Sequence, residues 1–196
     1  MNLVLLSGGM DSALTLYHAL GLEQRVMAMS FAYGQTHCVQ ENQAAASIAH
    51  HAGVPLTHVK LGSSLCGVGT PGAVVPARNI MFLSWAANWL DVQGGGTVFF
   101  GACAEDEAGF PDCREEFVLE FNRLLRLCEL KVQVEAPWIH ITKTMMLLKM
   151  IEVPGVEEAV RLSYSCYAGG REPCGWCEAC LKRDRALQQL WVRRER

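Results

Sequence analysis

The sequence predicts an α/β fold in which a doubly wound, mostly parallel sheet is covered by helices on both faces. Short apolar runs alternate with longer helical segments along nearly the whole chain, and this alternation is typical of βαβ units. With 196 residues, 51% of them hydrophobic, the chain is long enough for one domain with a complete core. We expect one compact unit, with the sheet in residues 1–150 and a helical extension in residues 151–196.

The strands are expected at the apolar runs and the helices between them. The expected strands are residues 3–6, 25–31, 56–61, 97–100 and 132–135. The expected helices are residues 12–20, 39–52, 80–90 and 115–130, a Met/Leu-rich segment from 143, and a charged segment from about 181. Residues 62–76 are rich in Gly, Ser and Pro, which predicts a loop.

Local signals mark several helix ends. Gly21 is expected to end the first helix, and Asn79 and Thr142 are expected to cap the helices that follow them. Asp112 and Glu115 have the spacing of a capping box at the start of the helix over 115–130.

Composition excludes some classes of partner. The net charge is −3 and no basic stripe is present, so we expect no nucleic-acid partner. No apolar run is long enough to span a membrane, and the apolar start at residues 1–6 is too short for a signal peptide, so we expect a cytoplasmic protein. The nine cysteines are an odd number, which argues against a disulfide framework.

A glycine-containing segment lies between the first expected strand and the first expected helix. It reads Ser7-Gly8-Gly9-Met10-Asp11-Ser12. Two glycines let backbone N–H groups turn toward an anion, and the start of the helix offers further donors. The natural purpose of an acid in an anion site is to coordinate a magnesium ion that bridges phosphates. The segment lacks a Walker A ending and resembles the PP-loop signature of ATP pyrophosphatases, which implies that it binds ATP. We also place Ser30, in the second strand, with the nucleotide-binding residues.

A cysteine cluster near the C-terminus predicts a metal site. Its members, with C-x7-C-x2-C-x2-C spacing, are Cys166, Cys174, Cys177 and Cys180. Four thiolates in one loop can close a tetrahedral zinc site, and such a site is structural because no position is left for substrate. The competing interpretation is an iron–sulfur cluster, although the ferredoxin spacing and its Cys-Pro ending are absent.

Two cations join Asp11 as candidate catalytic residues. Lys143 starts a helix, where its positive charge opposes the helix dipole and so indicates a nearby anion such as a phosphate of ATP. Arg78 also precedes a helix and is placed to reach phosphate.

Polar residues follow two of the expected strands, at the edge where an open parallel sheet binds its ligand. Carboxylates there can accept hydrogen bonds from a guanine-like N1–H and 2-amino group, and His37 is a candidate general base or hydrogen-bond donor. The candidate substrate residues are Tyr33, Gln35, His37, Glu105, Asp106 and Asp112.

In chain order, these motifs resemble the QueC family of 7-cyano-7-deazaguanine synthases. The matching segments are Ser-Gly-Gly-Met-Asp-Ser (7–12), Tyr-Gly-Gln (33–35), Val-Pro-Ala-Arg-Asn (75–79), Ala-Glu-Asp (104–106), Gly-Phe-Pro-Asp-Cys-Arg (109–114), Glu-Ala-Pro (135–137), Thr-Lys (142–143), Ser-Cys-Tyr (165–167) and Pro-Cys-Gly-x-Cys-x-x-Cys (173–180). The match covers nearly the whole chain, and the combination of the PP-loop with this cysteine pattern is specific to the family.

The resemblance implies an ATP-dependent carbon–nitrogen ligase with magnesium and a structural zinc ion. It implies a PP-loop ATP-binding domain in residues 1–150 with a zinc-binding helical region packed on it, and a homodimer. The implied substrates are 7-carboxy-7-deazaguanine and ammonia, and the implied product is the nitrile, formed through the amide.

The sequence also departs from the family pattern. Thr36 stands where Arg is usual, Ala32 where an acid is usual, and Glu107 where an aromatic residue is usual, while Ala13-Leu14 replace two threonines. These departures leave open a diverged ligase that stops at the amide or joins the activated deazapurine to an amine of another molecule, such as a protein. A PP-loop tRNA-modifying enzyme and a non-enzymatic nucleotide-binding module are further alternatives.

Overall fold

A five-stranded sheet forms the centre of the molecule. The computed structural model describes residues 1–22, 24–62 and 75–194, and all four pairs of neighbouring strands in the sheet are parallel. In spatial order the strands are β3 (Leu56–Lys60), β2 (Val26–Ala32), β1 (Asn2–Leu5), β4 (Gly96–Phe99) and β5 (Val132–Glu135). The predicted fold class is therefore confirmed.

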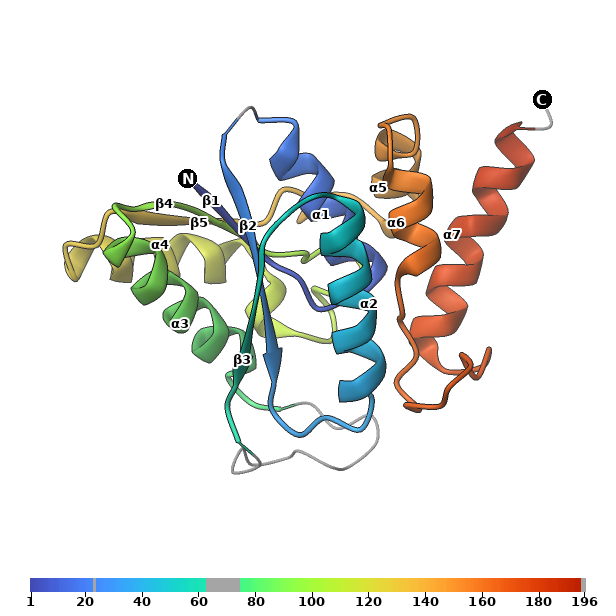
Figure 1. The fold of residues 1–196 in the computed structure, drawn as a ribbon, viewed down its shortest axis with the longest axis horizontal. Helices are drawn as coiled ribbons and strands as arrows, with labels where there is room; N and C mark the ends of the chain where they lie inside the picture. Colours follow the sequence, from blue (N-terminus) through green and yellow to red (C-terminus); the bar gives the residue numbers. More distant parts are fainter. Residues whose placement is uncertain (23, 63–74, 195–196) are drawn as a thin grey trace.

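Helices cover both faces of the sheet (Figure 1). One face carries α3 (Arg78–Val92) and α4 (Glu115–Leu127), with the short 3-10 helix η1 (Pro111–Cys113) before α4. The other face carries α1 (Met10–Leu20), α2 (Cys38–His51), α5 (Lys143–Met150), α6 (Val156–Leu162) and α7 (Glu178–Arg194). Along β1, Leu3 packs into one core and Val4 into the other. This explains the unbroken apolar run, because a strand covered on both faces needs no polar alternation.

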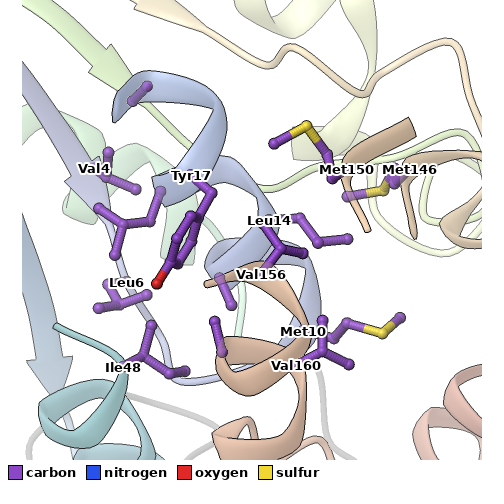
Figure 2. Packing of buried hydrophobic residues seen from close by; sticks show 14 of the residues in the cluster. Val4, Leu6, Met10, Leu14, Tyr17, Ile48, Met146, Met150, Val156 and Val160 are labelled. Atoms are coloured by element: carbon purple, nitrogen blue, oxygen red, sulfur yellow. The ribbon is translucent and has the colours of Figure 1, made fainter. Parts of the chain in front are cut away.

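The core on the α1 side joins segments from both ends of the sequence. Figure 2 shows Leu14 and Tyr17 of α1 among side chains of β1, α2, α5 and α6. Ala186 and Leu190 of α7 belong to the same buried cluster. Residues 151–196 therefore share a hydrophobic core with the sheet region, in line with a single compact unit, whereas the division at residue 150 stays a prediction.

The expected helix caps are only partly correct. Thr142 caps α5, since its Oγ1 accepts a hydrogen bond from the backbone N–H of Met145 at 3.3 Å. The predicted capping box is wrong: Arg114 precedes α4, and no side-chain hydrogen bond caps that helix. The Asp112 Oδ2 instead accepts from the backbone N–H of Asn79 at 3.2 Å. Because α3 begins at Arg78, Asn79 lies inside the helix rather than before it. The free N–H of Asn79 in the first turn of α3 is bound by Asp112 of η1.

Other element bounds differ by a few residues. Helix α7 begins at Glu178, three residues before the expected start, and α6 was not predicted. The expected loop over 62–76 lies mostly outside the described residues. In the part of the chain that the structure describes, no helix is both long and apolar enough to cross a membrane.

Truncation of Leu14 tests the shared core. Leu14 is fully buried, so we expect Leu14→Ala to lower the free energy of unfolding by about 2–5 kcal/mol, through lost burial and the cavity that remains. The matched control is Leu127→Ala, because the Leu127 side chain on α4 is 73% exposed. Urea denaturation followed by circular dichroism measures both, and equal losses in the two variants would contradict the packing described here.

Candidate functional site

A cavity of about 330 Å³ lies at the carboxyl ends of the strands, beside the segment after β1. Strands β1 and β4 are neighbours whose following helices, α1 and α4, lie on opposite faces of the sheet. Open α/β sheets bind their ligands at such a switch point. The predicted site residues that line the cavity are Ser7, Gly9, Met10, Asp11, Ser12, Ser30, Tyr33, Gln35, His37, Arg78, Asp106, Asp112 and Lys143.

The glycine segment is held tightly against its neighbours. Gly8 has a φ of +93°, and a Cβ built on it would lie 2.4 Å from the main-chain oxygen of Glu41. Glycine is therefore the residue that this position accepts. The Gly8 carbonyl accepts a hydrogen bond from the Tyr164 N–H at 2.8 Å, and the Ser12 hydroxyl donates to the Gly9 carbonyl at 2.9 Å. These contacts fix the loop whose N–H groups are expected to meet an anion.

Lys143 brings together two carboxylates beside this loop. Its ammonium group donates to the Asp11 Oδ2 and lies 3.7 Å from the Asp106 Oδ1. Burial alone would lower the pKa of Lys143, but the negative charges of Asp11 and Asp106 outweigh it and raise the pKa above its ordinary value. Lys143 therefore carries its charge throughout the physiological range.

The second oxygen of Asp11 fits a cation. Among the described residues, the Asp11 Oδ1 is buried and has no hydrogen-bond partner. A buried carboxylate oxygen without a partner is costly, and a hard cation such as Mg²⁺ prefers oxygen ligands. The donor atoms of Asp11, Asp106 and Cys103 lie within 4.8 Å of one another. The two carboxylates suit magnesium, whereas the thiol of Cys103 does not.

Glu105 has a different position from the one expected of a substrate residue. It does not line the cavity described above. Its Oε1 accepts from the backbone N–H of Lys143 at 3.0 Å, and its main-chain oxygen accepts from the Lys182 Nζ at 3.4 Å. An acid at the first turn of a helix is favourable, so Glu105 stabilises the start of α5, where Lys143 stands.

The segment after β2 forms the other wall of the cavity. The Gln35 side-chain amide donates to the Phe31 carbonyl at 3.2 Å and to the Glu41 Oε2 at 3.0 Å. The other carboxylate oxygen of Glu41 lies 3.3 Å from the His37 Nε2. Burial alone would lower the pKa of His37, but the bond to Glu41 more than offsets this and raises it. Glu41 was missed in the sequence, although its position four residues after His37 on a helix was a usable signal.

Arg78 lies near the predicted substrate residues. Its guanidinium donates to the Tyr33 hydroxyl at 3.2 Å. Asp112 binds the start of α3 through one oxygen, and the Asp106 Oδ2 accepts from the Cys103 N–H at 3.2 Å. Ser30 contacts the His58 Nδ1 at 2.5 Å. Most of the polar residues predicted for substrate thus lie at this cavity, but several of their atoms already serve the protein's own hydrogen bonds.

Further lining residues were not predicted from the sequence, although some of them are neighbours of Arg78 and Asp112. They are Tyr164, Tyr167, Lys182 and Arg183 from the C-terminal region and Asn79, Phe82, Phe110 and Cys113 from the α3 side. Burial raises the pKa of Cys113 to about 12, so its thiol stays protonated at neutral pH and is a poor nucleophile.

The four predicted metal ligands come together in the loop before α7 and in its first turn. The Sγ atoms of Cys166, Cys174, Cys177 and Cys180 lie within 4.8 Å of one another. Tetrahedral zinc with Zn–S bonds of 2.3 Å needs sulfurs about 3.8 Å apart, so the cluster fits this ion. Backbone N–H groups also point at the sulfurs, with Cys174 N donating to the Cys166 Sγ at 3.3 Å. Such donors stabilise thiolates, the form in which cysteine binds metals.

Comparison with known proteins agrees with the sequence resemblance. The family model described as "Queuosine biosynthesis protein QueC" matches residues 1–66 and 63–191. Among curated proteins, the 7-cyano-7-deazaguanine synthase of Synechococcus elongatus is 37% identical, over 94% of this chain and 89% of the relative. The synthases of Methylococcus capsulatus and Chlorobium limicola are 37% and 33% identical, over 96% and 97% of this chain and 94% and 93% of theirs.

A solved structure is similar in fold. It is the predicted subunit of a tRNA methyltransferase from Methanocaldococcus jannaschii, with a TM-score of 0.50 and 15% identity, covering 78% of this chain and 75% of that one. At this identity the likeness concerns the fold alone.

Metal analysis tests the cysteine cluster. We expect about one zinc per chain by elemental mass spectrometry, and removal by a chelator should lower the melting temperature by about 10 °C or more, because the metal binds the folded state. Cys177→Ser should lose the metal, whereas Cys128→Ser, at an exposed position after α4, should retain it. Iron with a visible absorption band would favour the iron–sulfur interpretation, and an unchanged metal content in Cys177→Ser would contradict the site.

Proposed function

We propose, from the fact that this chain belongs to the QueC family, that it is an ATP-dependent ligase that converts 7-carboxy-7-deazaguanine and ammonia into 7-cyano-7-deazaguanine. The observation that carries the proposal is the group of Asp11, Asp106 and Lys143 beside the glycine segment in the cavity. This group places a permanent cation and two carboxylates where the phosphates of a nucleotide would bind. The relatives named as synthases extend over nearly the whole chain.

The first step would activate the carboxylate of the substrate. A carboxylate oxygen attacks the α-phosphorus of ATP, the bond from that phosphorus to the bridging oxygen breaks, and pyrophosphate leaves with the electron pair. The N–H groups at residues 7–12 and the ammonium of Lys143 would stabilise the charge that develops on the leaving group. A magnesium ion held by Asp11 and Asp106 would supply further neutralisation of the phosphate oxygens.

The later steps would use the same cavity. Ammonia attacks the activated carboxyl carbon, AMP departs, and the nitrogen loses a proton to give the amide. A second ATP then adenylates the amide oxygen, with release of pyrophosphate and one N–H proton. Loss of AMP with the remaining N–H proton leaves the nitrile. Activation is needed twice because neither hydroxide nor oxide is an adequate leaving group.

The substrate's deazaguanine ring would lie between the segment after β2 and the segment around Asp112. Arg78 and Tyr33 offer a cation and an aromatic ring there, and Phe82 and Phe110 add apolar surface. His37, paired with Glu41, is placed to exchange a proton at this wall. The cytoplasm, where ATP is supplied, is the proposed location.

One of the departures from the family pattern, Thr36, lines the cavity at this wall. The Thr36 hydroxyl donates to the Tyr167 carbonyl at 3.4 Å, and Glu107 is exposed. A product that stops at the amide, or a conjugate with an amine of a protein, is the alternative that these positions motivate. The alternative of tRNA modification is not favoured by the relatives, which are named as 7-cyano-7-deazaguanine synthases.

Product mass is the direct test of the reaction. The protein is incubated with ATP, magnesium, ammonia and 7-carboxy-7-deazaguanine, and the products are separated by liquid chromatography and mass spectrometry. We expect the nitrile with two AMP for each product molecule. AMP with accumulated amide would indicate the diverged ligase, and the absence of ATP consumption would overturn the proposal.

Substitution of Lys143 tests the group that carries the proposal. We expect Lys143→Gln to reduce the rate of AMP release by at least about 100-fold, because loss of one preorganised electrostatic contact to a transition state has that magnitude. Lys149→Gln is the matched control, since Lys149 is exposed on the same helix. The measurement is the initial rate of AMP release from ATP, and equal rates in both variants would exclude Lys143 from the chemistry.

A further inference from the structure

Arg183 is a cation at the cavity that the proposed chemistry does not yet use. It comes from α7 and is one of the lining residues. Its guanidinium donates to the Ser163 hydroxyl and, at 2.7 Å, to the Val160 carbonyl. Both acceptors are uncharged. Within the described ranges no carboxylate lies within 4.0 Å of this guanidinium.

The two lysines that line the cavity, unlike Arg183, have carboxylate partners within 4.0 Å. Lys143 pairs with Asp11, and Lys182 lies 2.8 Å from the Glu178 carboxylate. Burial lowers the pKa of Arg183 below its ordinary value, and the negative charges of Asp184, Cys180 and Asp11, in decreasing order, offset this only in part. A half-buried charge without a close counter-ion is unfavourable. Such a position is favourable when a ligand supplies the opposite charge.

A chain of contacts connects Arg183 with the glycine segment. Ser163, which it contacts, directly precedes Tyr164, whose N–H donates to the Gly8 carbonyl at 2.8 Å. A Cβ built on Gly9 would lie 3.8 Å from the Tyr164 carbonyl oxygen. Arg183 also lines the same cavity as Ser7, Gly9 and Asp11. The anion that meets the loop would therefore also meet Arg183.

The guanidinium has donors to spare for such an anion. An arginine side chain has five N–H donors in a fixed fork, and this geometry matches the oxygens of a phosphate. Among the described residues, the guanidinium donates hydrogen bonds only to Ser163 and Val160. They also hold the side chain in place, which reduces the entropy cost of binding.

We propose that Arg183 binds the β- and γ-phosphates of ATP and retains the pyrophosphate after it leaves. The inference rests on the proposed function and extends it by assigning a phosphate-binding residue to the C-terminal region. Arg183 follows the metal ligand Cys180 by three residues on α7. The cysteine cluster therefore fixes the start of the helix that carries the phosphate-binding arginine.

The test is the affinity for pyrophosphate in the presence of magnesium, measured by isothermal titration calorimetry. We expect Arg183→Gln to bind pyrophosphate about 10- to 100-fold more weakly than the wild type, the loss typical of charge-assisted hydrogen bonds. AMP lacks the two outer phosphates and should bind both proteins equally. The matched control is Arg185→Gln, because Arg185 is exposed on the same helix and does not line the cavity.

Two further variants separate binding from structure. Ser163→Ala removes a contact of Arg183 but leaves its charge, so a purely structural role predicts the same weakening as in Arg183→Gln, and that result would overturn the proposal. Arg183→Lys keeps the charge without the fork and should bind pyrophosphate several-fold more weakly. Should Arg183→Gln fail to fold, as judged by circular dichroism, wild-type affinity in Arg183→Lys would overturn the proposal.

The same titrations separate this inference from the proposed function. Pyrophosphate binding that does not depend on Arg183 overturns this inference alone, whereas a wild type that binds neither ATP nor pyrophosphate overturns the proposed function as well.

Discussion

The ammonium group of Lys143 is the contact on which the arrangement of the site depends. It joins the start of α1 through Asp11 and the segment after β4 through Asp106, while Lys143 itself starts α5. Three segments that are far apart in the sequence therefore meet at one charge. Carboxylates close to one another repel unless a cation lies between them, so the Lys143 ammonium offsets the repulsion between Asp11 and Asp106 beside the glycine segment. Burial still raises the pKa of Asp11 above its ordinary value. Thr142 and Glu105 hold the lysine in place through the backbone of α5.

The sequence was sufficient for the fold because the fold depends on local patterns. Short apolar runs predicted all five strands, and Val132–Glu135 has the predicted bounds. The errors arise where a residue serves a partner that is distant in sequence. Asp112 has the spacing of a cap for α4 but binds the start of α3, and no local pattern distinguishes the two uses.

The sequence predicted which residues belong to the site better than it predicted which atoms they contact. The glycine segment and the cysteines carry spacing signals, and Lys143 carries the signal of a cation at a helix start. The structure brings Lys143 beside the glycine segment and gathers the four cysteines, whereas their roles stay predictions. Arg183 and Tyr164 carry no such signal, because their place at the cavity depends on how α6 and α7 pack on α1. Glu105 and Asp106 are adjacent in sequence, yet one contacts the helix backbone and the other the lysine side chain. Sequence reasoning assigns adjacent acids one role, and the turn that follows β4 separates them.

The shared core of α1 and α7 has a consequence for synthesis on the ribosome. Helix α1 is synthesised well before Ala186 and Leu190 of α7, which belong to the same buried cluster. Chain elongation is vectorial, and domains generally fold as units. The nascent protein must therefore carry an incompletely covered apolar face of α1 until α7 has emerged from the ribosome. The core closes only once α7 is available, and a chain terminated before α7 would display this face to chaperones and proteases.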